Sequence, residues 1–164
     1  MRKKAALFLS MAFLVSLSGC KIIDRYENDP KRLERDYADE IFHYIQNEDI
    51  DSLCGLFCEE IRQTHDLEAE WETFFARVDG NFESYDGLSF PVEGYGVDKS
   101  GKVFDNHLFV NYNGAYTDTG AVYDEFGYFV YRTHPYAPEY EGVNYFAIYL
   151  PEDDDWIMVG DTEP

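Results

Sequence analysis

Residues 108–133, LFVNYNGAYTDTGAVYDEFGYFVYRT, contain the pattern that decides how the second half of this chain folds. Two runs rich in aromatic and β-branched residues, 108–117 and 121–133, flank the polar triplet Asp118-Thr119-Gly120. Aromatic and β-branched side chains favour extended strands, whereas Asp and Gly are typical of tight turns. The stretch therefore predicts an antiparallel hairpin with its turn around Thr119-Gly120.

Further strands are expected on both sides of this hairpin. Most of the 14 tyrosines lie from Tyr85 onward. Residues 143–150 alternate, which places Phe146, Ile148 and Leu150 on one face and two tyrosines on the other. Residues 156–159 are expected to form a last short strand. Turns are predicted at the remaining Gly-containing pairs, Asp86-Gly87, Ser100-Gly101 and Asn113-Gly114.

The first half of the chain has helical periodicity instead. Apolar residues recur at three- and four-residue steps behind three start signals, each with an Asp as the expected cap. We predict three helices, over residues 30–47, 49–61 and 66–78. Gly55 weakens the second helix, so we expect it to be short or broken near Ile61.

Helices followed by an antiparallel sheet predict an α+β domain. This order resembles the nuclear-transport-factor-2-like fold, in which helices pack across a curved antiparallel sheet to form a cone. Over residues 30–150 the chain also resembles an uncharacterised family of lipoproteins from Gram-positive gut bacteria. That resemblance implies a fold more than a function, because it rests mostly on core positions: Asp49-Ile50-Asp51-Ser52-Leu53, Leu56-Phe57, Trp71, Phe74-Phe75, Gly80 and Ser84-Tyr85.

The N-terminus has the features of a secretory signal. Three basic residues at positions 2–4 precede an apolar run over residues 5–17, and Leu17-Ser18-Gly19-Cys20 follows. A membrane-spanning helix needs about 20 apolar residues, whereas signal peptides have a core of about 7–15. An ordinary secretory signal with an incidental cysteine is the alternative. Leu17-Ser18-Gly19-Cys20 resembles the lipobox of bacterial lipoproteins, which implies cleavage after Gly19 and attachment of lipid to Cys20.

These observations predict a division of the chain and a location. Residues 1–19 are expected to be the lipoprotein signal peptide, residues 20–29 a lipidated tether, and residues 30–164 a single α+β domain. A diacylated cysteine is a lasting membrane anchor. The expected location is the extracytoplasmic face of a bacterial cell membrane, with the lipid on Cys20 as the contact with the bilayer.

Composition excludes some partners. The net charge of the chain is −20, and the signal peptide would remove three of its basic residues. Such a surface repels phosphate backbones and anionic head groups, so neither nucleic-acid binding nor charge-driven membrane docking is expected. A content of 45% hydrophobic and 18% aromatic residues predicts a folded domain rather than a disordered one.

No metal or cofactor site is predicted. Cys54 and Cys58 are four residues apart on one side of a predicted helix, where either a disulfide or two half-buried thiols would be compatible with the sequence. Neither has the neighbouring His or Cys residues of a zinc site. The acidic run 152–155 lacks the ligand spacing and central Gly of a calcium loop, so we interpret it as a solvated turn.

The resemblance to cone folds implies a pocket between the helices and the sheet. We expect its candidate lining residues to be Trp71, Phe75, Tyr112, Asp124 and Tyr131. Acid or base candidates near it are Asp124, Glu125, His107 and His134, and each has an alternative interpretation as a surface, turn or strand-end residue. No pair of these residues has a spacing typical of a catalytic site, and no catalytic residue is assigned.

The high content of aromatic residues indicates that the protein binds a ligand. Tyr and Trp are flat, amphipathic and cost little entropy to order, so exposed copies suit sugars and peptides. We expect the protein to bind a small ligand, peptide or glycan through a pocket or an aromatic face. The alternatives are a pocket enzyme of isomerase or hydrolase type and a structural or interaction protein of the cell envelope.

Overall fold

The helix α2 (Pro30–Gln46) begins at the proline that the sequence marks as a helix start. It is the first element among residues 30–161, the part of the chain that the computed structural model describes. The predicted signal peptide, Cys20 and tether lie outside the described residues. The chain divides into two compact units at residues 39 and 40, which are described separately, and the single domain from residue 30 stays a prediction. The described part of the first unit is the start of α2.

Three further helices follow in the second unit, together with the end of α2. They are α3 (Ile50–Gly55), α4 (Glu59–Thr64) and α5 (Leu67–Arg77). The carboxylate of Asp49 accepts a hydrogen bond from the Ser52 amide at 3.2 Å, and that of Asp66 accepts one from the Ala69 amide at 3.4 Å. Side-chain acceptors at these positions satisfy amides that a helix start leaves unpaired. The two predicted helix starts are confirmed.

The second predicted helix is short, as Gly55 led us to expect, but the prediction of three helices in this half is wrong. The chain leaves the helix after Gly55 and enters a second helix at Glu59, so four helices occupy residues 30–77. Between them Phe57 forms a parallel bridge with Val143, and the Cys58 amide donates to the Val143 carbonyl at 2.8 Å. Pairing with a distant strand, at a point where Gly55 already weakens the helix, explains the break.

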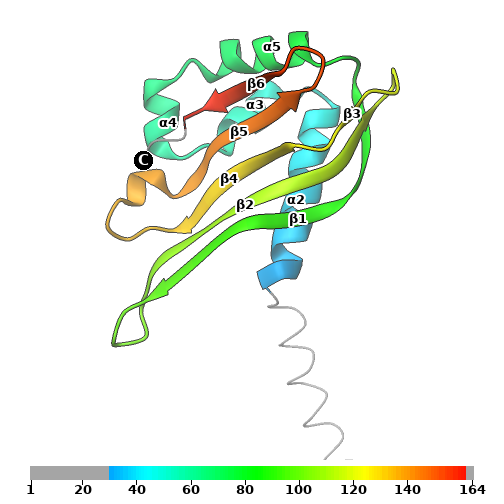
Figure 1. Ribbon diagram of the computed structural model, residues 1–164. Coiled ribbons are helices and arrows are strands. Elements are labelled where there is room, and N and C mark those ends of the chain that lie inside the picture. Colours follow the sequence, from blue (N-terminus) through cyan, green and yellow to red (C-terminus); the bar gives the residue numbers. More distant parts are fainter. Residues whose placement is uncertain (1–29, 162–164) are drawn as a thin grey trace, which may run out of the picture. The chain divides into compact units, whose positions relative to one another are not determined.

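The second half forms one antiparallel sheet, so the chain is of the α+β class. Its order is β1-β2-β4-β5-β6, and the short β3 pairs with β2 (Figure 1). The strands are β1 (Phe82–Val97), β2 (Val103–Thr117), β3 (Val122–Tyr123), β4 (Phe126–Thr133), β5 (Gly142–Leu150) and β6 (Asp155–Gly160). The predicted hairpin is confirmed: β2 pairs with β4, and the Gly120 amide donates to the Thr117 carbonyl at 3.0 Å in the turn.

Two of the predicted turns are instead strand interiors. Asp86-Gly87 lies within β1 and Asn113-Gly114 within β2, and Gly87 pairs directly with Asn113. Gly114 has φ +58°, a conformation that favours glycine, and a Cβ there would lie 2.8 Å from an Asp86 carboxylate oxygen. The same dipeptides that make turns therefore also occur here inside long paired strands.

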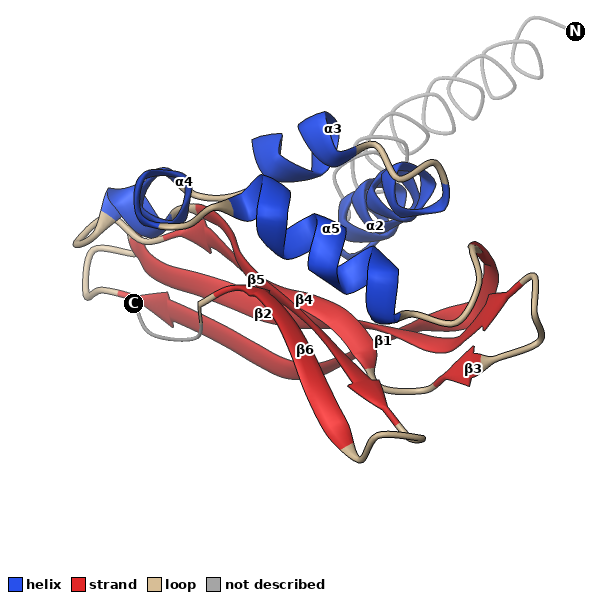
Figure 2. Ribbon diagram, turned by 90° about the horizontal axis from the view of Figure 1, so that it is seen from above, coloured by secondary structure: helices blue, strands red, loops and turns tan. Residues whose placement is uncertain are grey.

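Helices cover one face of the sheet in the second unit, and the core lies between them (Figure 2). Trp71 of α5 packs edge-on against Phe146 of β5, with ring centroids 4.9 Å apart. Phe74 packs against Phe126 of β4 at 5.8 Å. Alternation along each strand turns the intervening side chains to the other face, which no element within residues 40–161 covers. We call this second face the open face.

Gly127→Ala is expected to destabilise the domain by about 1–3 kcal/mol, the usual cost of overpacking. Gly127 lies in β4, between β2 and β5, and a Cβ there would lie 2.0 Å from the Val110 carbonyl oxygen. That contact is with backbone, so the strands must separate. Gly87→Ala is the matched control, since a Cβ at Gly87 has no atom within 4 Å. Urea unfolding of both variants checks this, and equal losses would contradict it.

Asp118→Asn is expected to make the free energy of unfolding depend less on pH in the acidic range. The carboxylate of Asp118 accepts from the Asn81 amide and from Asn81 Nδ2, each at 2.9 Å, and these bonds lower the pKa of Asp118 from 3.8. A lowered folded pKa contributes stability above the unfolded pKa, and that stability is lost as the pH falls through the folded pKa. The unfolding free energies of parent and variant should differ near neutral pH and converge as the pH falls below the folded pKa of Asp118. A constant difference across this range would contradict the prediction.

Candidate functional site

The open face carries two groups of aromatic side chains. The first aromatic cluster spans three neighbouring strands, β2, β4 and β5. Its members are half-buried: His107, Phe109, Phe129, Tyr131 and Tyr145. The second aromatic cluster pairs Tyr149 of β5 with Trp156 of β6. Both clusters lie opposite the face that the helices cover.

The first aromatic cluster is held together by ring contacts. The rings of Phe129 and Tyr145 stack with centroids 5.6 Å apart and planes 4° apart, because their strands pair them directly. Phe109 lies 6.1 Å from Tyr145. Tyr131 contacts Phe129 edge-on at 5.1 Å and His107 at 5.4 Å. Cross-strand aromatic pairs stabilise a sheet, and here they join the five rings into one cluster whose ring planes range from stacked to edge-on.

The second aromatic cluster is more exposed. Trp156 is 47% exposed and lies 5.5 Å from Tyr149 between ring centroids. The Tyr149 hydroxyl donates to the Asp154 carboxylate at 2.6 Å, which raises the pKa of Tyr149 and fixes its ring. Trp156 therefore presents a large aromatic surface to solvent beside an oriented tyrosine.

Polar groups border the first aromatic cluster. His107 Nδ1 lies 2.8 Å from the Asp105 carboxylate, and both side chains are partly buried. Burial, with a smaller effect of Asp105, raises the pKa of Tyr131, and burial raises that of Tyr145. Both phenols therefore stay neutral near neutral pH and can donate hydrogen bonds. The cluster combines apolar ring faces with neutral polar edges.

The five residues predicted to line a pocket do not form one group. Trp71 and Phe75 stack on α5, with ring centroids 5.5 Å apart, and Tyr112 is fully buried against Phe126 in the core. Asp124 is exposed in the bend between β3 and β4, while Tyr131 belongs to the open face. The structure thus brings Trp71 and Phe75 together and leaves Asp124 and Tyr131 apart from them.

A groove of about 290 Å³ lies elsewhere, between the end of α5, β3 and the β5–β6 turn. None of the five predicted residues lines it. The acidic run at residues 152–155 borders it as an exposed turn, and Arg77 contacts Asp153 at 3.0 Å and Asp155 at 3.1 Å. No group of three or more His, Cys, Asp or Glu residues in the described part of the chain is placed to hold a metal ion.

Sequence reasoning assigned no site role to most of the open face. Residues 143–150 alternate as predicted, so Tyr145 and Tyr149 could have been placed together on the face opposite Phe146. The partners of these tyrosines could not be assigned without the register. Strand pairing joins Tyr145 to Phe129 and Tyr149 to Trp156.

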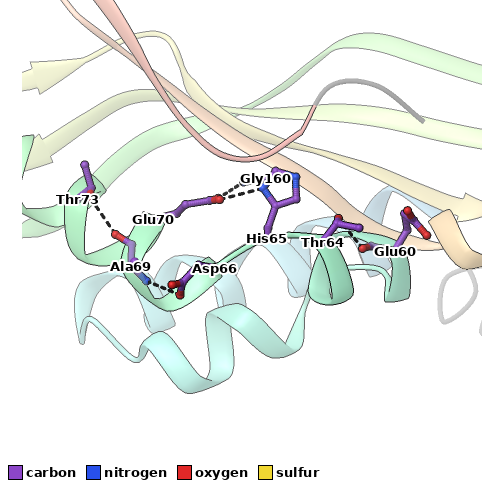
Figure 3. A network of polar contacts seen from close by, with 8 residues as sticks. All are labelled: Glu60, Thr64, His65, Asp66, Ala69, Glu70, Thr73 and Gly160. Atoms are coloured by element: carbon purple, nitrogen blue, oxygen red, sulfur yellow. Dashed lines mark hydrogen bonds and ion pairs between the residues drawn. The ribbon is translucent and has the colours of Figure 1, made fainter.

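A polar network fastens α5 to the last strand (Figure 3). One carboxylate oxygen of Glu70 lies 2.9 Å from His65 Nδ1, and the other accepts from the Gly160 amide at 2.8 Å. Gly160 ends β6 with φ +84°, and a Cβ there would lie 2.2 Å from the Asn144 carbonyl oxygen. Glu70 thereby satisfies a backbone donor where the strand ends, which is a structural role.

The two cysteines are free thiols in separate elements. Cys54 lies in α3, whereas Cys58 caps α4 and its thiol contacts Asn144 Oδ1 at 3.7 Å. Burial raises the pKa of both thiols. A raised thiol pKa leaves little thiolate near neutral pH, and thiolate is the nucleophilic form. Neither cysteine has the environment of a catalytic nucleophile.

Comparison with known families identifies the family of this chain. A family model described as a domain of unknown function, DUF5104, matches residues 40–151. The chain belongs to the DUF5104 family. The match covers α3 to β5 with both tyrosines of β5, and it ends before Trp156. No curated protein matches the chain.

None of the helices within residues 30–161 of the DUF5104 protein is both long enough and apolar enough to span a bilayer.

Proposed function

We propose that this DUF5104 protein is a lipoprotein anchored through Cys20 on the extracytoplasmic face of a bacterial membrane, where its open face binds a ligand. The observation that supports binding is the first aromatic cluster, a half-buried group of rings with no covering element in the described part of the second unit, together with Trp156, which is 47% exposed on the same face. Large exposed apolar patches mark interaction sites on soluble domains. The anchor rests on the lipobox resemblance alone.

We also propose that the sheet belongs to the nuclear-transport-factor-2-like cone. Irregular pairing interrupts the register of β1 with β2 between Ser89 and Val92, and that of β4 with β5 between Phe129 and Val130. Irregularities of this kind bend strands and increase twist, which is what a curved sheet requires. An experimental structure that superposes on such cones would support this assignment, and a flat sheet would contradict it.

Variants of the first aromatic cluster test the binding function. Full-length protein in detergent should be screened against glycans, peptides and small metabolites, beside a Phe129→Leu/Tyr145→Leu double variant. Leucine keeps apolar bulk but removes the flat ring. The expected result is a ligand that binds the parent and binds the double variant at least tenfold more weakly. Tyr95→Leu is the control, because Tyr95 is 66% exposed outside both clusters.

A ligand that binds the parent and the double variant equally would overturn the open face as the site. Melting curves of the variants separate lost binding from lost folding. The same curves in the presence of ligand should rise for the parent and for Tyr95→Leu, because a ligand stabilises the state that it binds.

A pocket enzyme of hydrolase or isomerase type is the second candidate. The observation that favours it is the Asp105–His107 pair beside Tyr131, since a carboxylate that orients a histidine is a common arrangement for acid–base chemistry. If the bound ligand is converted, His107→Ala should abolish turnover and retain at least part of the binding. Unchanged turnover in that variant would remove His107 from the reaction.

A further inference from the structure

The two aromatic clusters stand apart on one strand. Tyr145 and Tyr149 lie four residues apart on the same face of β5, which corresponds to about 13 Å along the strand. Between them on this face Ala147 pairs with Gly127 on one side and with Met158, which is 38% exposed, on the other. From this spacing, and resting on the proposed ligand-binding function, we propose that the ligand is an extended uncharged glycan whose sugar rings stack on both clusters at once.

The chemistry of the face suits sugar rings. Aromatic faces carry partial negative charge and attract polarised C–H groups, which line the faces of many sugars. Sugar hydroxyls at the ring edge need hydrogen-bonding partners in turn. Asn111 and Asn113 of β2 form a polar row on the same face: Asn111 Nδ2 donates to Asn113 Oδ1 at 2.9 Å, and Ser89 Oγ donates to the same oxygen at 2.8 Å. These bonds orient the amides and leave Asn111 Oδ1 and Asn113 Nδ2 for a ligand.

An extended peptide fits this face less well. Peptides that bind to sheets typically add to a sheet edge, where the backbone groups of an outer strand are unpaired. The first aromatic cluster lies on β2, β4 and β5, which all have neighbours on both sides, so a ligand there meets side chains alone and ring stacking is the main contact. The second aromatic cluster reaches the edge strand β6 only through Trp156.

The charge of the open face favours an uncharged glycan as the ligand. The residues of the two clusters, those between them and the asparagine row include no Lys or Arg, whereas Asp105 and Asp154 hold carboxylates beside the clusters. The whole chain carries −20. A polyanionic glycan would meet repulsion at both ends of the face, without a cation to offset it.

The test uses full-length protein in detergent and linear oligomers of glucose, mannose, xylose and N-acetylglucosamine, each with two or six units. Polygalacturonate is the anionic comparison. Calorimetry should show at least one neutral series whose hexamer binds at least tenfold more tightly than its dimer, because the second contact becomes intramolecular. Trp156→Ala and Tyr145→Leu should each reduce the hexamer affinity to that of the dimer. Tyr95→Ala, outside both clusters, should change neither affinity.

The emission of Trp156 provides an independent reading, since the other tryptophan, Trp71, is fully buried. Hexamers should shift this emission and shield it from iodide. Equal affinity for dimer and hexamer, or tighter binding of polygalacturonate, would overturn the glycan inference but not the binding function. If only peptides bind the parent, and the Phe129→Leu/Tyr145→Leu variant binds them more weakly, the glycan inference fails and the binding function stands. Self-association through the open face, seen as concentration-dependent shielding of Trp156, would overturn both.

Discussion

Trp71→Ala is expected to destabilise the DUF5104 domain by about 3–5 kcal/mol, the range for removing a large buried aromatic side chain. Trp71 is fully buried and contacts rings on both sides of the core, Phe74 and Phe75 of its own helix and Phe146 of the sheet. Alanine would leave a cavity where α5 meets β5. Because domains of this size are stable by only about 5–15 kcal/mol, the variant should lose a large part of its stability.

Trp71→Phe is the matched control. The indole nitrogen of Trp71 is buried without a hydrogen-bond partner, so its removal leaves no protein group unpaired. Phenylalanine retains much of the ring surface and should cost clearly less than alanine. Urea unfolding of parent and both variants measures the difference. An alanine variant as stable as the parent would show that Trp71 is not in the core.

Local chemistry was sufficient to predict where most elements begin. Asp49 and Asp66 act as helix caps as expected, and the hairpin after Thr117 turns at Gly120. The position of the helix break after Gly55 could not be predicted from the sequence, because the break depends on pairing with Val143, far along the chain. Ser100-Gly101 forms a turn, yet Asp86-Gly87 pairs within a strand. The dipeptide alone does not determine whether the chain turns or continues as a paired strand. The register of the neighbouring strand determines it.

The candidate site was less accessible to sequence reasoning than the fold. The abundance of tyrosine predicted an aromatic surface, but not which rings meet. Tyr112 and Tyr131 lie on neighbouring strands and point to opposite faces, one into the core and one onto the open face. Asp124 lies in the bend before β4 and is exposed. Assigning a side chain to a face requires the register, and the β2–β4 register is irregular at Asn106 and His107.

Cys20→Ala is expected to abolish lipidation completely and to leave an uncleaved precursor. In the lipobox interpretation the Cys20 thiol carries the diacylglycerol, and the signal peptidase cuts before the acylated cysteine only. Alanine has no thiol to acylate, so the precursor should keep residues 1–19. Mass spectrometry of membrane and soluble fractions measures both the acyl mass and the new N-terminus.

Cys54→Ala is the matched control for this substitution, since Cys54 is a free thiol within α3. It should be processed and acylated like the parent. The lipobox interpretation fails if the Cys20→Ala protein is cut at Gly19 and released without lipid, because an ordinary secretory signal would then account for the N-terminus. It also fails if the parent carries no acyl mass on Cys20. Lipid on the parent and on Cys54→Ala, but not on Cys20→Ala, would support an extracytoplasmic location for the open face.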